Sequence, residues 1–306
     1  MRSAPDATDA AAVRIAGNAI YRGETPLTPA YLAIDSFDVS VERREVIFSA
    51  KRETSFDVGL VSLDGSQVNW VPEDPADEVA PQWAPRGHKA SYIVRNRGGD
   101  LIRTVHIPTA FQLVVDFPFG VVRDLAWDDG GERFALAWES PDASPRIEVL
   151  RYGGEERRIA VAPSVQLDVE VTPFAGGLML RPASLVYNER LPLVVWRTGG
   201  RLNEWSDARG ALLRSGRIAL LVVDAAAGDA VAQAIDRTSW IDRDRLFVVD
   251  PEGTAELAGA VVVRGDAGVR AGFYRRDARG IAVHPGSVES TAVGYIQEQL
   301  KVPHGG

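Results

Sequence analysis

The sequence predicts a two-part fold, with antiparallel β-sheets in the first half and an α/β unit on a parallel sheet in the second. Between residues 33 and 163, glycine-rich turns separate short apolar or alternating segments, a pattern typical of β-strands. After residue 182, apolar strands alternate with segments of helical spacing, which indicates parallel strands joined by helices. A repeat of 44 to 46 residues in the first half is the third observation.

Six strands are predicted in the first half from their period-two or fully apolar character. They cover residues 45–50, 57–63, 89–95, 102–108, 133–139 and 146–152. Turn dipeptides such as Asp64-Gly65 and Gly98-Gly99 lie between them. No helix is predicted in this half, so an all-β arrangement is expected.

The repeat is anchored by an aromatic residue that precedes a polar turn, a strand, a second turn and another strand. The anchors are Phe37, Trp83 and Trp127, which are 46 and 44 residues apart. This interval suits a four-stranded blade of a β-propeller, and a β-sandwich with fortuitous spacing is the alternative. Three blades cannot close a ring. Residues 13–22 and 165–187 are therefore expected to supply a closing blade jointly, unless the sheet stays partly open.

Two of the repeats resemble the blades of TolB-like and prolyl-oligopeptidase-type propellers, in which a turn of the form W-S-P-D-G precedes a strand. The matching segments read "WAPRGHKASYI" and "WDDGGERFALA". The tryptophans of the repeats include Trp83, Trp127 and Trp138. Packing within the blades is one interpretation of these three residues, and a binding surface at the mouth of a propeller is the other.

The second half is predicted to contain four strands and four helices in alternation. The strands cover residues 191–200, 217–225, 245–250 and 269–275, and the helices 205–216, 229–240, 254–263 and 290–301. Ser290 is the expected N-cap of the last helix. The strand at 217–225 is apolar throughout, as strands buried in parallel sheets are.

Residues 185–275 resemble the α/β-hydrolase domain of the prolyl oligopeptidase family. The segments that carry the resemblance are, in order, "LPLVVWRTGG", "LLRSGRIALLVVDAAAGD", "IDRDRLFVVDPEGTAELAGA" and "GVRAGFYR". The resemblance implies a short propeller of about four blades, or an incomplete one, over residues 13–187. A truncated α/β-hydrolase-like domain would follow over residues 188–306. Residues 1–12 contain no apolar stretch of the kind found in signal peptides and are expected to be disordered.

The positions that carry chemistry in this family differ here. The nucleophile turn, G-x-S-x-G, reads Asp250-Pro251-Glu252-Gly253-Thr254, so Glu252 replaces the serine. The oxyanion loop reads Thr198-Gly199-Gly200 and lacks the family's histidine. His284 precedes the last helix and resembles the family's histidine loop. Either Glu252 is a nucleophile with His284 activating water and Gly199 and Gly200 as oxyanion loop, or the site has decayed and Glu252 is a loop residue.

Composition excludes several classes of function. The chain of 306 residues has a net charge of −8, which disfavours binding to the nucleic acid backbone. It has no cysteine, so disulfides, thiolate metal sites and cysteine nucleophiles are excluded. No apolar run is long enough to span a bilayer. No cofactor or metal site is predicted, and the compartment is open between cytoplasm and periplasm.

The sequence therefore predicts a non-catalytic binding or scaffold protein derived from a propeller-plus-hydrolase ancestor, with a protein or peptide as partner. The alternative is a hydrolase of peptides or esters that uses Glu252 and His284. A third hypothesis makes the chain a subunit of a larger assembly that covers its open sheet edges.

Overall fold

The structure is a computed structural model in which the chain divides into two compact units. The first unit comprises Met1–Trp138 with Arg146–Ala162, and the second comprises Glu139–Pro145 with Pro163–Gly306. The structure describes residues 12–65, 67–72, 75–152, 157–161, 164–224, 231, 235–250, 261–266, 270–275, 278–280 and 288–301. Apart from Ala12, the segment for which disorder is predicted lies outside the described residues.

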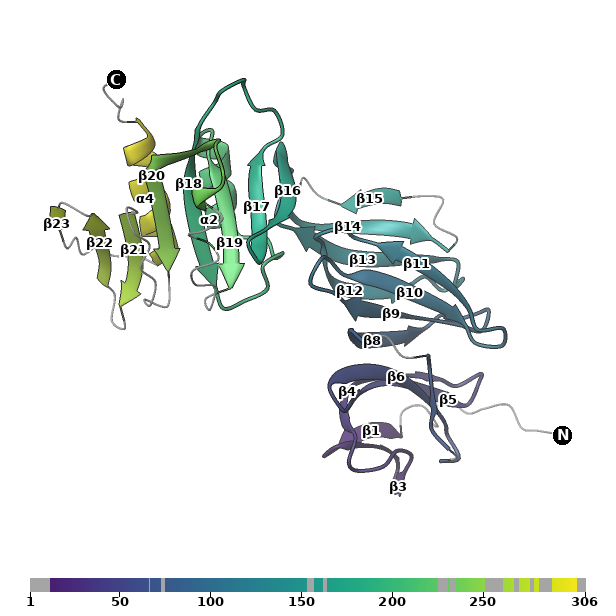
Figure 1. The fold of residues 1–306 in the computed structure, drawn as a ribbon. Helices are drawn as coiled ribbons and strands as arrows, with labels where there is room; N and C mark the ends of the chain where they lie inside the picture. Colours follow the sequence, from purple (N-terminus) through teal and green to yellow (C-terminus); the bar gives the residue numbers. More distant parts are fainter. Residues whose placement is uncertain are drawn as a thin grey trace. The chain divides into compact units, whose positions relative to one another are not determined.

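The first unit is built from small antiparallel sheets, three of which have four strands in sequence order (Figure 1). The first of these contains β4 (Ala33–Ser40), β5 (Glu45–Arg52), β6 (Ser55–Ser62) and β7 (Asn69–Trp70). The second contains β8 (Asp77–Trp83), β9 (Lys89–Arg95), β10 (Leu101–His106) and β11 (Phe111–Asp116). The third contains β12 (Val121–Trp127), β13 (Arg133–Ser140), β14 (Ala143–Arg151) and β15 (Arg157–Val161). None of these sheets closes on itself.

The six strands predicted in this half are confirmed, and each of the three repeats forms one of these sheets. The packing of β9 explains why its consecutive residues are apolar. Tyr92 and Val94 pack with Ile47 of the first sheet, whereas Ile93 packs with Phe134 of the third. The second sheet is therefore buried on both faces, and successive residues of β9 point to opposite faces as in any strand.

The predicted closing blade is wrong. Residues 13–22 form β1 (Val13–Ala16) and β2 (Ala19–Arg22), which join β3 (Thr25–Pro26) in a three-stranded sheet. Residues 165–187 instead supply β16 (Val169–Phe174) and β17 (Gly177–Pro182), and β17 pairs antiparallel with β19 (Ala219–Asp224) of the second unit. Gly177 allows this pairing, because a methyl group there would lie 2.2 Å from the carbonyl oxygen of Val222.

The second unit is organised around an eight-stranded mixed sheet with the order β16-β17-β19-β18-β20-β21-β22-β23. Its remaining strands are β18 (Leu191–Thr198), β20 (Ile241–Asp250), β21 (Val261–Asp266), β22 (Arg270–Arg275) and β23 (Ala278–Gly280). The strands β19, β18, β20 and β21 are mutually parallel. The helices of this unit whose bounds lie within the described residues are α2 (Asp207–Ser215) and α4 (Val288–Lys301). Among the described helices, none is long and apolar enough to cross a membrane.

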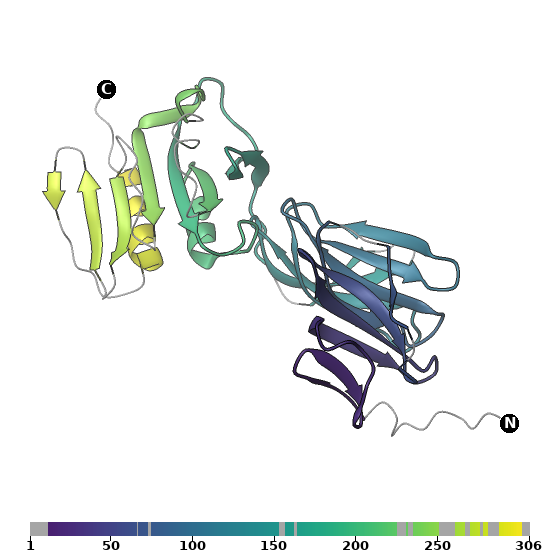
Figure 2. The same ribbon diagram turned by 60° about the horizontal axis from the view of Figure 1, so that its bottom comes forward.

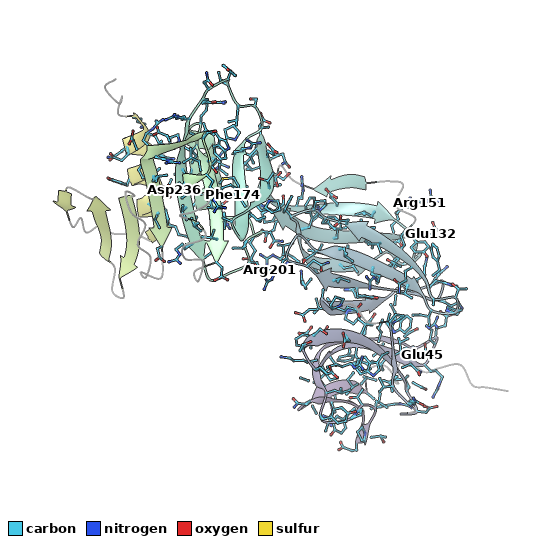
Figure 3. All side chains as sticks on the ribbon, in the orientation of Figure 1. Glu45, Glu132, Arg151, Phe174, Arg201 and Asp236 are labelled. Carbon is cyan, nitrogen blue, oxygen red and sulfur yellow. The ribbon has the colours of Figure 1, made fainter. Side chains whose placement is uncertain are left out.

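Apolar side chains cover both faces of the central strands. On one face, Leu193, Val195 and Val248 pack with Val231 and Ile235 of the connection between β19 and β20, and Phe174 of β16 packs against this cluster (Figure 3). The alternate residues are equally buried and belong to the other face, which the two helices contact and where they also contact each other (Figure 2). This two-sided burial explains the continuous apolar runs of β18, β19 and β20.

Two predictions at the end of the chain are wrong. Residues 261–263, expected at the end of a helix, begin β21, and their three consecutive valines favour a strand. The last helix begins at Val288, so Ser290 lies inside its first turn and is not its N-cap. Of the helix predicted at 229–240, the described residues with helical conformation are 231, 235 and 236.

Candidate functional site

The order of the parallel strands singles out one edge of the second sheet as a candidate site. The chain passes from β18 through α2 to β19, and then crosses β18 to reach β20. The helix α2 lies on one face of the sheet, whereas Val231 and Ile235 of the next connection lie on the other. Open parallel sheets bind ligands at the carboxyl ends of strands where the connections diverge in this way. We call the ends of β18, β19 and β20 the carboxyl edge.

A buried ion pair joins two strands at the carboxyl edge. Arg197 of β18 is 9% exposed and Asp250, the last residue of β20, is fully buried. Their atoms Nη1 and Oδ2 lie 3.7 Å apart. The sequence predicts Asp250 at the first glycine position of a nucleophile turn of the form G-x-S-x-G. A buried carboxylate is stable there because a cation accompanies it, so the pair ties the end of β20 to β18.

The loop after β18 satisfies its own backbone donor. The hydroxyl oxygen Oγ1 of Thr198 accepts a hydrogen bond of 3.1 Å from the backbone N–H of Gly200. A methyl group added to Gly200 would lie 3.5 Å from the Glu204 carboxylate oxygen Oε2. The loop therefore has one donor already occupied and a negative charge beside it, whereas an oxyanion site needs open donors and no competing anion.

The next segment is fixed by a buried arginine. Arg209 of α2 donates to the carbonyl oxygens of Glu204 at 2.6 Å and Leu202 at 3.4 Å. Burial lowers the pKa of Arg209, and the nearby carboxylates of Glu289, Glu204 and Glu139 oppose this shift. Ser206 caps α2 by accepting from the Arg209 N–H. The segment 201–209 is thus held by partly buried hydrogen bonds.

The predicted catalytic residues are only partly described. Gly199 and Gly200 lie at the carboxyl edge, directly after β18, which pairs with β20. Glu252 and His284 lie outside the described residues. Arg197 and Asp250 were missed as a pair. Both stand at the end of an apolar strand run, and the rule that parallel strands end at a common edge would have brought them together.

The three candidate binding tryptophans lie within the first unit and pack against cations. The ring of Trp83 has the Arg43 guanidinium 4.7 Å from its centroid, and Trp138 has that of Arg146 at 4.0 Å. Trp127 is partly buried and lies 5.5 Å from Nζ of Lys89. They belong to two different apolar clusters, because Trp83 packs between the first two sheets and the other two between the second and third. A ligand-binding role for them stays a prediction.

The described residues contain no group of three or more acidic or histidine side chains that could hold a metal ion. At the carboxyl edge Arg197 pairs with Asp250, and Asp224, the last residue of β19, is exposed. Chemistry at this edge would therefore rest on the described side chains of Arg197, Thr198, Glu204, Asp224 and Asp250.

Solved structures show which fold the chain shares. It is similar to a prolyl endopeptidase structure with a TM-score of 0.54 and 16% identity, over 74% of this chain and 39% of that one. Prolyl oligopeptidase B from Galerina marginata gives a TM-score of 0.57 at 12% identity, covering 74% and 38%. An acylaminoacyl peptidase from Pyrococcus horikoshii gives 0.55 at 10%, covering 75% and 42%.

These similarities establish that the fold is of the prolyl oligopeptidase type. The chain spans about two fifths of the length of the structures it matches. No model of a protein family matches the sequence. No curated protein sequence matches it either.

Proposed function

We propose that the protein is a non-catalytic binding protein built on the propeller-plus-hydrolase plan of these peptidases. In this proposal the three four-stranded sheets are propeller blades, and the parallel strands are a truncated α/β-hydrolase sheet. The observation that carries the proposal is the hydrogen bond from the Gly200 N–H to Thr198 Oγ1, which occupies a donor of the expected oxyanion loop.

Three further features support the loss of acyl transfer. Glu252 stands where the nucleophilic serine is expected. The Glu204 carboxylate lies beside Gly200, where it would repel the negative charge of a tetrahedral intermediate. Asp250 replaces a glycine and is fully buried against Arg197. Each change removes or opposes one part of the machinery that acyl transfer requires.

The proposed class of partner follows from the fold shared with peptidases. The similar structures are peptidases, so a site descended from theirs is suited to a protein or peptide segment. The net charge of −8 disfavours nucleic acid as the principal partner. A scaffold that holds a peptide without cleaving it accounts for both the shared fold and the altered residues.

Hydrolysis assays test the proposal directly. The full chain is assayed against a panel of p-nitrophenyl esters and aminoacyl-nitroanilides, alongside the variants Glu252→Ala and His284→Ala. We expect no turnover above that of buffer in any of the three proteins. Turnover by the wild type that disappears in both variants would instead establish the alternative, a hydrolase in which Glu252 is the nucleophile and His284 activates water.

A further inference from the structure

The amino ends of the parallel strands, on the opposite edge of the second sheet, border a pair of hollows. One has a volume of about 460 Å³ and is lined by the start of β18, by Arg245 and by the end of α4. The other has a volume of about 450 Å³ and lies along Gln166–Val169 and the end of α2. Both are lined by Ser215, Gly216 and Arg217. Because they share this wall, we treat them as one feature and call it the amino-edge groove.

The amino-edge groove is cationic, although the protein is acidic. Its lining includes five cationic residues but only two carboxylates, Asp168 and Glu189. The cations are Arg190, Arg214, Arg217, Arg245 and Lys301. The local excess of positive charge contrasts with the net charge of −8 of the whole chain. Such a concave patch of one sign attracts a ligand of the opposite sign.

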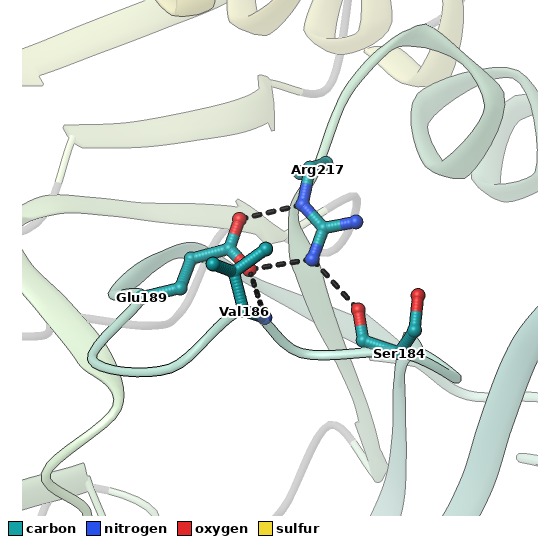
Figure 4. A network of polar contacts seen from close by, with 4 residues as sticks. All are labelled: Ser184, Val186, Glu189 and Arg217. Atoms are coloured by element: carbon teal, nitrogen blue, oxygen red, sulfur yellow. Dashed lines mark hydrogen bonds and ion pairs between the residues drawn. The ribbon is translucent and has the colours of Figure 1, made fainter.

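One of these cations is held in place by a bonded network (Figure 4). Arg217 donates to both carboxylate oxygens of Glu189 and, at 2.7 Å, to the carbonyl oxygen of Ser184. Glu189 also accepts from the Val186 N–H at 3.0 Å. The hydrogen bonds from Arg217 and then from Val186 lower the pKa of Glu189 to about 2. The shared wall of the groove is therefore a fixed element that carries its charges at neutral pH.

Helix ends account for only part of the positive charge. Arg214 and Lys301 lie in the last turns of α2 and α4, where cations offset the helix dipole. Arg190, Arg217 and Arg245 belong to strands or to the segments before them. Arg245 is paired with Asp242 at 2.6 Å, whereas Arg190 and Arg214 are exposed. These two cations, one in each hollow, remain available to a ligand.

The rest of the lining favours a peptide over a polyphosphate. Partly exposed apolar residues such as Val169, Leu213 and Leu300 form part of the walls. Asp168 and Glu189 would repel closely spaced phosphates, but they leave room for carboxylates that apolar side chains separate. An extended peptide that alternates acidic and apolar residues satisfies both kinds of surface.

We propose that the amino-edge groove binds an extended acidic peptide segment of a partner protein. Carboxylates of the peptide would face Arg190 and Arg214, and its apolar side chains would contact Val169, Leu213 and Leu300. This inference goes beyond the proposed function, since it concerns the edge of the sheet opposite to the hydrolase-like site. If catalysis were found at the carboxyl edge, this inference about the amino-edge groove would still stand.

Fluorescence anisotropy with the full chain tests the proposal. The probe is a labelled peptide that alternates Glu with Leu or Val, and the comparison peptide has Gln in place of each Glu. The groove variant carries Arg190→Glu and Arg214→Glu. The matched control carries Arg86→Glu and Arg97→Glu, two exposed residues of the first unit, so both variants change the net charge equally. A single-stranded oligonucleotide serves as competitor.

We expect the acidic peptide to bind and the groove variant to raise its Kd by about tenfold, because two ion pairs with the peptide are replaced by repulsions. The control variant should change the Kd by less than about twofold. Equal weakening by both variants would show an effect of overall charge and overturn the proposal. So would equal binding of the Gln peptide, absence of binding, or displacement by the oligonucleotide at lower concentrations than the unlabelled peptide.

Discussion

At the scale of single residues, the carboxyl edge is marked by charged side chains that are buried. Asp250 is fully buried and Arg197 and Arg209 are nearly so. Such groups are stable only when partners compensate them. They tie the end of β20 to β18, and α2 to the loop that precedes it.

Breaking the Arg197–Asp250 pair should destabilise the protein strongly. In Arg197→Met the Asp250 carboxylate stays buried without its cation, so we expect the free energy of unfolding in urea to fall by about 3 kcal/mol. The double variant Arg197→Met, Asp250→Asn removes both charges and should recover a large part of that loss. If the double variant is as unstable as the single one, the ion pair is not what Arg197 contributes.

Glu189 gives a prediction for the dependence of stability on pH. Its pKa is lowered from 4.5 to about 2 by the hydrogen bonds from Arg217 and Val186. Because the pKa is lower in the folded state, ionised Glu189 stabilises that state at pH values above 4.5. This stabilisation is lost as pH falls from 4.5 through about 2. Thermal melts should therefore show Glu189→Gln below wild type at pH 7, with the gap shrinking below pH 4.

The matched control for this prediction is Asp168→Asn, because Asp168 lines the same groove and is exposed. Its melting temperature relative to wild type should not follow the same trend. A gap between wild type and Glu189→Gln that stays constant down to pH 3 would contradict the assignment of the lowered pKa to Glu189.

At the scale of elements, a repeated contact joins neighbouring sheets of the first unit. Arg43 lies six residues after Phe37 and covers Trp83 of the next sheet, and Lys89 lies six residues after Trp83 and approaches Trp127 of the following one. Lys89 also donates to the Gly131 carbonyl oxygen at 2.6 Å. Burial lowers the pKa of Lys89 against the opposing influence of Glu132 and Asp128. The sequence repeat is thus also a repeat of packing contacts.

The pairing of β17 with β19 should depend on Gly177. A methyl group there would lie 2.2 Å from the Val222 carbonyl oxygen, which belongs to the backbone and cannot easily move. We expect Gly177→Ala to lower the free energy of unfolding by about 2 kcal/mol. Gly98→Ala is the control, since nothing lies within 4 Å of its added methyl group. Equal effects of the two substitutions in chemical denaturation would disprove the close approach.

The sequence was informative where a single element carries its own signal and uninformative where distant segments decide. The strands β5, β9, β18 and β19 were predictable from apolar runs bounded by turns. The partner of β17 was not, because it depends on a close approach between Gly177 and a strand some forty residues later. The Arg197–Asp250 pair was within reach of the sequence, because it lies at the ends of two predicted parallel strands, but only if the common edge of those strands is considered.

At the scale of the whole molecule, the two proposed sites lie on opposite edges of one sheet. The carboxyl edge carries the buried Arg197–Asp250 pair, and the amino-edge groove carries the excess of cations. Parallel strands give a sheet two chemically different edges, so one unit can lose a reaction at one edge and keep a binding surface at the other.

The path of the chain predicts how the protein responds to a cut. Residues 139–145 precede β15 in sequence but belong to the second unit. There Ser144 and Val165 exchange hydrogen bonds of 2.9 and 2.8 Å, and the Leu167 N–H donates to the Asp142 carbonyl oxygen. A protease site inserted between Gly153 and Gly154 would therefore yield two pieces that remain bonded to each other, since β14 also pairs with β15.

After cleavage at this site, the two pieces should elute together from a size-exclusion column in native buffer and separate only in denaturant. Weakening the junction with Ser144→Ala and Gln166→Ala removes the bonds to Val165 and Asp142 that these side chains make. The cut variant should then separate at a lower urea concentration than the cut wild type. If the two pieces of the cut wild type separate in native buffer, the bonds between residues 139–145 and residues 165–167 are too weak to hold the pieces together.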